Sequence, residues 1–319
     1  MSDKVFKLAT ASSAGSPPFV AIVLDDDAIA LEAVLPHFRA SRGKAPLPLA
    51  SGSMQGLLDT WDASFDQLQE IVAFVTAAGL KDSRWTDATG PWSKLRLHAP
   101  IPRPPKMLFA SVNYPRAGQP PKSDGIVRRP SMFQKTSSCV VGPYDDIVKP
   151  RGFDDLSWEV EFALVIGREA RHVPVERALD YVAGYVTAND VTVLNFRQPG
   201  ELPIPGPDWY GAKCHDTFAP LGPFLVPRAF VPDCRNLRLT CKINGETLQD
   251  GNTRDMIFSP EEQIAHCASH GRLEPGDVIS TGTPSGIAMH VGRWLKVGDV
   301  VECEVEGLGA QRSRLVAEA

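Results

Sequence analysis

Residues 157–190 read SWEVEFALVIGREARHVPVERALDYVAGYVTAND, and this stretch decides both the fold and the chemistry that we expect. Glu159 and Glu161 lie two residues apart in a run rich in Val, Phe, Leu and Ile, which is typical of a buried strand. Side chains in a strand alternate between its two faces, so the two carboxylates point the same way and the apolar residues point into a core. A second apolar run, residues 181–188, precedes Asp190, which can supply a third carboxylate.

The spacing of the acidic residues by itself leaves two interpretations open. Neighbouring buried carboxylates repel each other and lose hydration unless a positive charge lies between them, and a divalent cation meets that need. The alternative is an edge strand with a polar, solvated face, in which Asp190 is a turn residue after Asn189. A helix would place residues i and i+2 on different sides, but the β-branched content argues against a helix.

Composition restricts the class of protein. The chain has 319 residues, of which 43% are hydrophobic and 22% charged, as in a globular protein with a full core. The net charge is −5 and no basic cluster extends beyond Arg128-Arg129, so we expect no nucleic-acid partner.

The start, MSDKVFKLAT, does not resemble a signal peptide, and the apolar run at residues 19–24 is too short to cross a membrane. Six cysteines without a CxxC spacing resemble the scattered thiols of a cytosolic protein, so we expect a cytoplasmic location and no membrane partner.

Two domains are expected. Residues 1–100 predict a small N-terminal domain with short strands and an amphipathic helix over residues 55–78, which ends at Gly79. The segment HAPIPRPPK at residues 98–106 predicts a stiff boundary. Residues 101–319 contain short apolar runs separated by Gly and Pro, which predict a closed or stacked β-rich architecture.

One helix and two long loops stand out in the second domain. Ser259, Pro260 and Glu262 predict the N-cap, the first-turn proline and the capping-box glutamate of a helix. The stretches 115–130 and 199–211 are too long and too rich in Pro and Gly for regular elements, and loops of this kind are often lids.

Several blocks beyond residue 106 resemble, in order and spacing, the fumarylacetoacetate hydrolase family. They are VNY at 112–114, PSMFQK at 130–135, VGPYDDIVKP at 141–150, WEVEFALVIG at 158–167, VAGYVTAND at 182–190, GAKCHDTFAPLGP at 211–223, INGETLQDGNTRDMIF at 243–258, EPGDVISTGTPSGI at 274–287 and LKVGDVVECEVEGLG at 295–309. Several blocks in the same order and spacing identify a family more specifically than any single motif does. The resemblance implies an α+β, β-rich fold, with a mixed β-roll C-terminal catalytic domain and a smaller N-terminal domain, and it implies a homodimer.

The resemblance also implies a metal centre. Glu159, Glu161 and Asp190 match the ligands of one Mg²⁺ or Mn²⁺, with Ca²⁺ in some members, and an all-oxygen ligand set independently suits such hard cations. Three carboxylates leave the site negative, so a nearby positive side chain is expected. Lys213 matches the active-site lysine of the family, although GAKCH by itself suggests a surface lysine.

Candidate substrate-binding residues follow from the same resemblance. They are Asn113 and Tyr114 of the NY motif, Thr283 in GTPSG, and Arg197. Without the family resemblance, Thr283 would be interpreted as a residue that stabilises a turn. Gly282 and Gly286 are expected to let the backbone approach the ligand.

Family substrates are 2-oxo or 1,3-diketo acids, and the resemblance implies a hydrolase that cleaves a C–C bond of a 1,3-diketo or acylpyruvate-type acid. The metal would act as a Lewis acid, and Lys213 would support the charge of the enolate. Many members activate water with a lid His and a Glu, but here those positions hold Ala117 and Pro120. An Arg and a Gln that help to hold the substrate in many members are replaced by Leu194 and Arg197.

These departures leave the reaction open. His215, two residues beyond Lys213, and His290, after the GTPSG turn, are candidates for another water-activating base, although a packing or surface role fits each of them as well. If water activation is lost, isomerase, hydratase or decarboxylase chemistry on a 2-oxo acid remains, as does a catalytically impaired binding paralogue. The retained carboxylates and Lys213 favour an enzyme.

Overall fold

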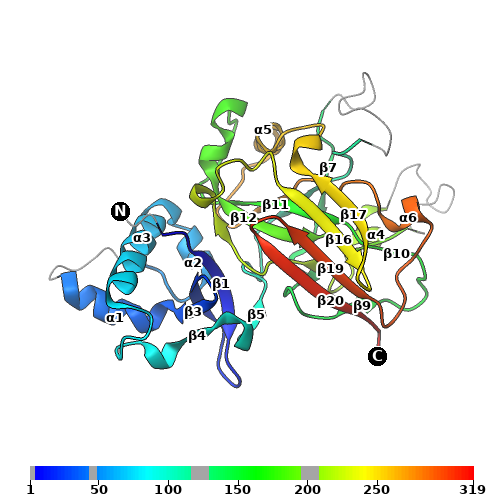
Figure 1. Cartoon of the computed structure of the whole chain (residues 1–319). Helices are drawn as coiled ribbons and strands as arrows, with labels where there is room; N and C mark the ends of the chain where they lie inside the picture. Colours follow the sequence, from blue (N-terminus) through cyan, green and yellow to red (C-terminus); the bar gives the residue numbers. More distant parts are fainter. Residues whose placement is uncertain (1–3, 43–48, 116–128, 195–207) are drawn as a thin grey trace.

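The computed structural model describes residues 4–42, 49–115, 129–194 and 208–319. Within them the chain forms a small N-terminal domain beside a larger, strand-rich domain (Figure 1). The α+β, β-rich class is therefore confirmed. The last strand of the small sheet ends at His98 and the first strand of the large domain begins at Met107, while the division between residues 100 and 101 stays a prediction.

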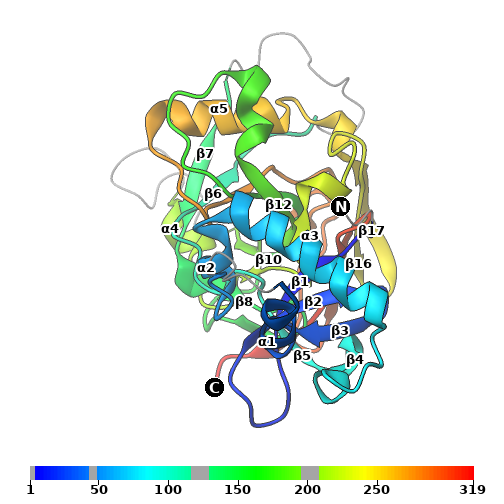
Figure 2. The same cartoon turned by 90° about the vertical axis from the view of Figure 1, so that its left-hand side faces the viewer.

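The small domain is built on an antiparallel sheet with strand order β4-β3-β2-β1-β5. Its elements are β1 (Lys7–Ser12), β2 (Phe19–Leu24), β3 (Asp27–Ala30), α1 (Leu31–Arg42), α2 (Met54–Leu58), α3 (Trp61–Ala78), β4 (Thr89–Pro91) and β5 (Arg96–His98). The apolar strands β1 and β2 are almost wholly buried, and α1 packs on β2, β3 and α3 (Figure 2).

The helix predicted over residues 55–78 is interrupted. α2 ends at Leu58 and α3 begins at Trp61, with Thr60 in a non-helical conformation at φ −132° and ψ 42°. The apolar spacing continues through the break because both helices bury the same side, so the periodicity did not reveal it. α3 ends where Gly79 takes a positive φ of 92°, at the predicted position.

The large domain contains two main sheets, which pack face to face (Figure 1). One has strand order β15-β12-β11-β18-β6-β7, and the other has β17-β16-β19-β20-β9. The strands are β6 (Met107–Ala110), β7 (Met132–Lys135), β8 (Val140–Val141), β9 (Ile147–Lys149), β10 (Leu156–Ser157), β11 (Val160–Ile166), β12 (Val182–Asn189), β13 (Thr192–Val193), β14 (Ala219–Pro220), β15 (Val226–Pro227), β16 (Arg238–Ile243), β17 (Glu246–Asn252), β18 (Val278–Ser280), β19 (Val300–Val305) and β20 (Gly309–Ala317). Strands β11 and β12 are buried along their whole length, because β16, β19 and β20 cover them.

The helices of the large domain are short. They are α4 (Trp209–Lys213), α5 (Pro260–His270) and α6 (Ala288–Val291), with 3₁₀ turns η3 (Ser137–Cys139), η4 (Val175–Tyr181), η6 (Arg228–Phe230) and η7 (Thr253–Asp255). The predicted capping box of α5 is confirmed: the Glu262 amide donates to Ser259 Oγ at 3.3 Å, and the Ser259 amide donates to the Glu262 carboxylate at 2.7 Å. Among the described helices, none is both long and apolar enough to span a bilayer.

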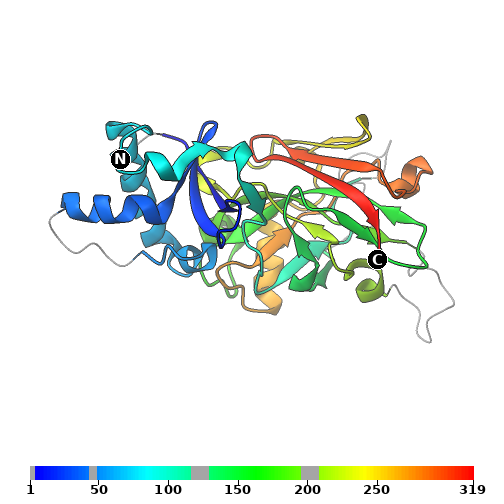
Figure 3. The same cartoon turned by 90° about the horizontal axis from the view of Figure 1, so that it is seen from below.

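The two domains lie side by side (Figure 3), and main-chain and aromatic contacts join them. Leu8 of β1 and Leu225, next to β15, exchange two backbone hydrogen bonds of 2.9 and 2.8 Å. The ring of Phe6 lies 5.0 Å from that of Phe230, edge to face. The small domain therefore packs beside β15, the edge strand next to β12.

Candidate metal centre

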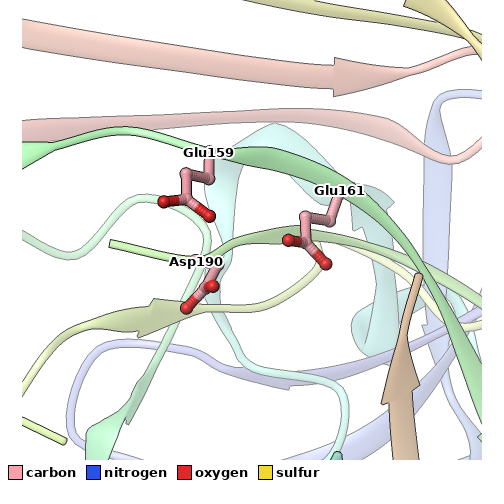
Figure 4. Close-up of side chains that lie close together, drawn as sticks. All are labelled: Glu159, Glu161 and Asp190. Carbon is pink, nitrogen blue, oxygen red and sulfur yellow. The ribbon is translucent and has the colours of Figure 1, made fainter. Parts of the chain in front are cut away.

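Three carboxylates converge where β11 begins and β12 ends (Figure 4). β11 and β12 are antiparallel, with Val160 opposite Asn189. Glu159 therefore lies beside Asp190, whose amide donates to the Glu159 carbonyl at 2.9 Å. Glu161 shares the face of Glu159 by strand alternation. One oxygen from each residue lies within 4.8 Å of the others, and all three residues are buried.

Glu161 is fully buried. Its Oε2 accepts hydrogen bonds from Ser280 Oγ at 2.5 Å and from the Gly282 amide at 2.9 Å. Its Oε1 is buried and has no hydrogen-bond partner among the described residues. Burial, followed by the charges of Asp190 and Glu159, raises the pKa of Glu161 well above its usual range.

Gly282 has a specific structural reason to be glycine. Its φ is +94°, a region that disfavours side chains, and an added Cβ would lie 2.8 Å from Cβ of Asn113. This close approach brings the Gly282 amide to Glu161. Gly286 has φ +107°, and an added Cβ would lie 2.0 Å from the Leu248 carbonyl oxygen. The glycine at 286 is therefore required by chain packing, whereas the sequence had suggested approach to a ligand.

Lys213 bridges the other two carboxylates. Its Nζ donates to Glu159 Oε2 at 3.0 Å and to Asp190 Oδ2, and the side chain is almost fully buried. Burial alone would lower the pKa of Lys213, but Asp190 and Glu159 raise it above its ordinary value. The remaining oxygen of Glu159, Oε1, accepts from Thr192 Oγ1 at 3.0 Å.

The surface position that GAKCH suggested for Lys213 is wrong. Lys213 is the last residue of α4, whose N-cap Asp208 accepts a hydrogen bond from the Gly211 amide at 3.0 Å. Burial of a lysine is costly unless its charge is paired. The paired carboxylates, which are distant in sequence, provide that compensation.

Lys135 is a second cation of this cluster, and our sequence reasoning did not single it out. Its Nζ donates to Asp190 Oδ1 at 2.7 Å and to the carbonyls of Phe218 at 2.7 Å and Val191 at 3.2 Å. The signal was present in PSMFQK, because strand alternation places Lys135 on the buried face of β7 with Phe133. A lysine at an inward position of a short apolar strand predicts a buried charge partner.

Aromatic rings form a wall beside both lysines. Phe133 and Trp209 stack with ring centroids 4.6 Å apart and planes 4° from parallel. Lys213 Nζ lies 5.2 Å from the centre of the Phe133 ring, and Lys135 Nζ lies 5.3 Å from that of Phe109. These rings limit water around the ammonium groups and strengthen their electrostatic interactions.

The residues fit a divalent cation. Two ammonium groups face three carboxylates, so the cluster retains one negative charge if all the groups are ionised. The orphaned Glu161 Oε1 has a buried lone pair that no described donor satisfies. Carboxylate oxygens are the ligands that Mg²⁺ and Mn²⁺ prefer. The assignment of Glu159, Glu161 and Asp190 as ligands remains a prediction that this geometry supports.

Comparison with known proteins places this site in a family. The sequence matches the family described as fumarylacetoacetate (FAA) hydrolase, C-terminal, over residues 109–316, which is more than half of the chain. The chain belongs to the fumarylacetoacetate hydrolase family. All three carboxylates and both lysines lie inside the matched region.

Relatives within the fumarylacetoacetate hydrolase family have different names. The chain is 38% identical over 228 residues to the mitochondrial oxaloacetate tautomerase Fahd2a of Rattus norvegicus, covering 71% of each chain. A solved structure of a probable 2-hydroxyhepta-2,4-diene-1,7-dioate isomerase from Mycobacterium abscessus is 26% identical with a TM-score of 0.72, and 99% of each chain is covered. Maleylpyruvate hydrolase from Sphingobium sp. SYK-6, solved with manganese(II) and pyruvate, is 25% identical with a TM-score of 0.71, covering 98% of this chain and 100% of that one.

Among the predicted substrate-binding residues, Asn113 and Thr283 have their polar atoms engaged within the chain. Asn113 Nδ2 donates to the carbonyls of Thr281 at 2.7 Å and Phe258 at 3.0 Å, and its Oδ1 accepts from the Phe258 amide at 2.8 Å. Thr283 Oγ1 donates to the Val160 carbonyl at 2.8 Å and accepts from a glutamine amide at 2.8 Å. Both side chains hold the GTPSG turn against the strands that carry the site.

Tyr114 is different, because its hydroxyl is buried and has no hydrogen-bond partner among the described residues. Burial, then the charges of Glu161 and Asp255, raises the pKa of Tyr114 well above its usual value. The hydroxyl therefore keeps its proton. A buried hydroxyl that no described residue engages is available to a bound molecule.

The predicted histidines lie differently from the expectation. His215 does not share a strand face with Lys213, because α4 ends at Lys213 and Cys214 caps it. His215 Nε2 lies 2.8 Å from the Gly211 carbonyl oxygen, and its ring packs against Phe218. His290 is exposed on α6, with Nδ1 accepting from the Gly286 amide at 3.3 Å.

Arg197 and the lid positions Ala117 and Pro120 lie outside the described residues. Leu194, which takes the place of a family arginine, is buried, and its amide donates to the Asp155 carbonyl at 3.2 Å.

Proposed function

We propose that this protein is a metal-dependent tautomerase that interconverts the keto and enol forms of a small 2-oxo dicarboxylic acid of the oxaloacetate class. The observation that carries the proposal is the buried cluster in which two lysines face three carboxylates and one carboxylate oxygen has no partner among the described residues. The 38% identity to an oxaloacetate tautomerase supports the reaction class. The isomerase alternative thus becomes the main hypothesis, ahead of the C–C hydrolase.

The charge of the cluster suits an acidic substrate. A bound divalent cation would supply Lewis-acid polarisation of the 2-oxo oxygen and would turn the residual negative charge of the cluster into a positive one. The site would then attract a carboxylate. Lys213 is kept protonated by Asp190 and Glu159, so its ammonium group can stabilise the negative charge that develops on the enolate oxygen. Lys135 holds Asp190 in place through Oδ1.

Tautomerisation needs proton transfer but consumes no water. One proton moves between C3 and the oxygen on C2 of the substrate. Tyr114 retains a proton at its hydroxyl oxygen and has no described partner, so we assign it the exchange of a proton with the enol oxygen. No water-activating base is required. This agrees with the sequence, in which Ala117 and Pro120 occupy the positions of the family's lid His and Glu.

A second candidate keeps the original hydrolase prediction. The likeness to maleylpyruvate hydrolase, solved with manganese(II) and pyruvate, favours cleavage of an acylpyruvate by the same metal centre. On this hypothesis His215 or His290 would have to activate water, and either imidazole would need to turn away from its backbone contact.

One assay separates the two reactions. Purified protein with Mg²⁺ or Mn²⁺ is given freshly dissolved enol-oxaloacetate, and the loss of enol absorbance is followed; acylpyruvate cleavage is followed in parallel by pyruvate release. We expect accelerated tautomerisation, with kcat/KM at least about tenfold above that for acylpyruvate cleavage, one order of magnitude being about 1.4 kcal/mol in barrier. Acylpyruvate cleavage that exceeds tautomerisation would refute the proposal and support the hydrolase.

Variants sharpen the same assay. Lys213→Met should lower tautomerisation by about 100-fold or more, as for the loss of one electrostatic stabiliser. Tyr114→Phe should lower kcat with little effect on KM, because the phenol acts in proton transfer. Lys242→Met, at an exposed lysine of β16, is the matched control and should match the parent.

Homodimer formation and cytoplasmic location remain predictions. The rat relative is described as mitochondrial, and the structure contains one chain. Light scattering after size exclusion measures the oligomeric state directly.

A further inference from the structure

Two cysteines meet directly behind the metal centre. Cys139 ends η3, four residues after Lys135, and Cys214 follows Lys213. The Cys139 sulfur lies 4.0 Å from the carbonyl oxygen of Lys213 and 3.1 Å from Thr136 Oγ1. The thiols of Cys139 and Cys214 interact closely enough for each to shift the pKa of the other. Each thiol thus lies on a segment that delivers one of the two buried lysines.

In this pair, one thiol has a lowered pKa and the other is partly exposed to solvent. The hydrogen bond from Cys214 lowers the pKa of Cys139 to about 6, so the pair carries a negative charge at neutral pH. The same hydrogen bond raises the pKa of Cys214. Cys139 is fully buried, whereas Cys214 is partly exposed, and its sulfur lies 3.8 Å from the Gln134 carbonyl oxygen. Solvent therefore reaches one sulfur of the pair.

Another pair of cysteines provides an internal contrast. Cys241 and Cys303 face each other across β16 and β19 with sulfurs 3.7 Å apart. Both are buried, and burial raises the pKa of Cys241 well above its ordinary value. Cys241 and Cys303 are therefore close together but closed to solvent, whereas Cys214 is partly exposed. All six cysteines lie in the described residues, and none forms a disulfide.

We propose that Cys139 and Cys214 are a peroxide-sensitive thiol pair whose reversible disulfide ties together the two segments that carry the lysines of the metal centre. Hydrogen peroxide is the oxidant. The proton of Cys214 passes along the S–H···S contact to Cys139, and the exposed Cys214 sulfur attacks the peroxide. The O–O bond breaks, Cys214 sulfenic acid forms, and the released hydroxide takes a proton from solvent to become the first water.

The second step closes the bridge. The Cys139 sulfur attacks the Cys214 sulfur, the S–S bond forms, and the S–O bond breaks. The departing hydroxide takes the thiol proton and leaves as the second water. In total, the thiol–thiolate pair, one peroxide and one proton from solvent give one disulfide and two waters. A dithiol reductant reverses the reaction.

The bridge acts on Lys213 through the main chain. A disulfide is about 2.05 Å long and requires specific dihedral angles, so the sulfurs must approach from non-covalent contact. Because Cys214 directly follows Lys213, this approach shifts the end of α4 relative to the segment that carries Lys135. A displacement of about 1 Å in an active site can cost about 100-fold in rate. We therefore expect oxidation to lower turnover by about tenfold or more, an expectation that rests on the proposed function.

The chemical test does not depend on activity. The reduced full-length protein is treated with hydrogen peroxide, the remaining thiols are alkylated, and peptides are mapped by mass spectrometry. We expect a peptide linked through Cys139 and Cys214, lost on treatment with dithiothreitol, while Cys241 and Cys303 stay alkylated. Oxidation of Cys214 without a link to Cys139, or linkage of Cys241 to Cys303 at an equal rate, would overturn the proposal.

The functional test uses Cys214→Ser, which keeps a polar side chain of similar size. The variant should retain parental turnover and thermal stability in the reduced state and should lose its peroxide sensitivity. Cys139→Ala is a second variant with the same expectation. A Cys214→Ser protein as peroxide-sensitive as the parent refutes the switch. If the linked peptide forms but no 2-oxo acid is turned over, the thiol pair stands and the proposed function fails.

Discussion

Replacement of Lys135 by methionine tests whether the second lysine stabilises the metal centre. The substitution keeps a long apolar stem but removes an ammonium group that donates to Asp190 and to the carbonyls of Val191 and Phe218. Loss of one partner of a buried ion pair costs about 3–5 kcal/mol. The two carbonyls that lose their buried donor each add a cost of about 1 kcal/mol or more. The contacts share one group and are not additive, so we expect Lys135→Met to lower the free energy of unfolding by about 4 kcal/mol.

The assay is thermal unfolding of the metal-free protein followed by circular dichroism. A loss of about 4 kcal/mol corresponds to a fall in Tm of roughly 8–16 °C for a domain of this size. Lys242→Met, at an exposed position of β16, should change Tm by less than about 2 °C. A Lys135→Met protein within 2 °C of the parent would show that the buried contacts contribute little to stability, and the electrostatic reasoning about the cluster would then be wrong.

Three further predictions concern the metal, pH and the helix cap. Mg²⁺ or Mn²⁺ at about 100 times its dissociation constant should stabilise the protein by about 2.7 kcal/mol, measured as a rise in Tm, and Glu161→Ala should abolish the rise. Because the pKa of Glu161 is raised in the folded state, the metal-free protein should lose stability as pH rises from about 4 toward that pKa. Protons compete with the cation over the same range, so the metal-induced rise in Tm should be larger at pH 8 than at pH 5.5; an equal rise would contradict this. Ser259→Ala removes the N-cap of α5 and should cost about 1 kcal/mol, a fall in Tm of about 2–4 °C, whereas no change would show that the cap is dispensable.

Local rules account for several correct predictions. The alternation of a strand was sufficient to place Glu159 and Glu161 on one face, and the capping box of α5 follows from Ser259 and Glu262 alone. The strand-rich composition between turns also indicated the β-rich class. These features depend on neighbours within a few residues, and the sequence displays such neighbours directly.

Other features depended on contacts between distant segments. The interruption of the first amphipathic helix after Leu58 was hidden, because its apolar spacing continues through the break. The surface position considered for Lys213 and the shared strand face for His215 were wrong, because residues 209–213 form a helix. The amide of Asn113, predicted to bind substrate, is fully used within the chain.

The sequence alone determined that two carboxylates share a strand face and that a third ends the neighbouring apolar run, because strand geometry is local. Only the tertiary structure decided what faces them. Lys135 and Lys213 are 78 residues apart in the numbering, yet both reach Asp190, and their burial is stabilised only by that convergence. The same is true of Cys139 and Cys214. Charge pairing and thiol contact depend on distance in space, and the fold sets that distance through the packing of α4 against the strands.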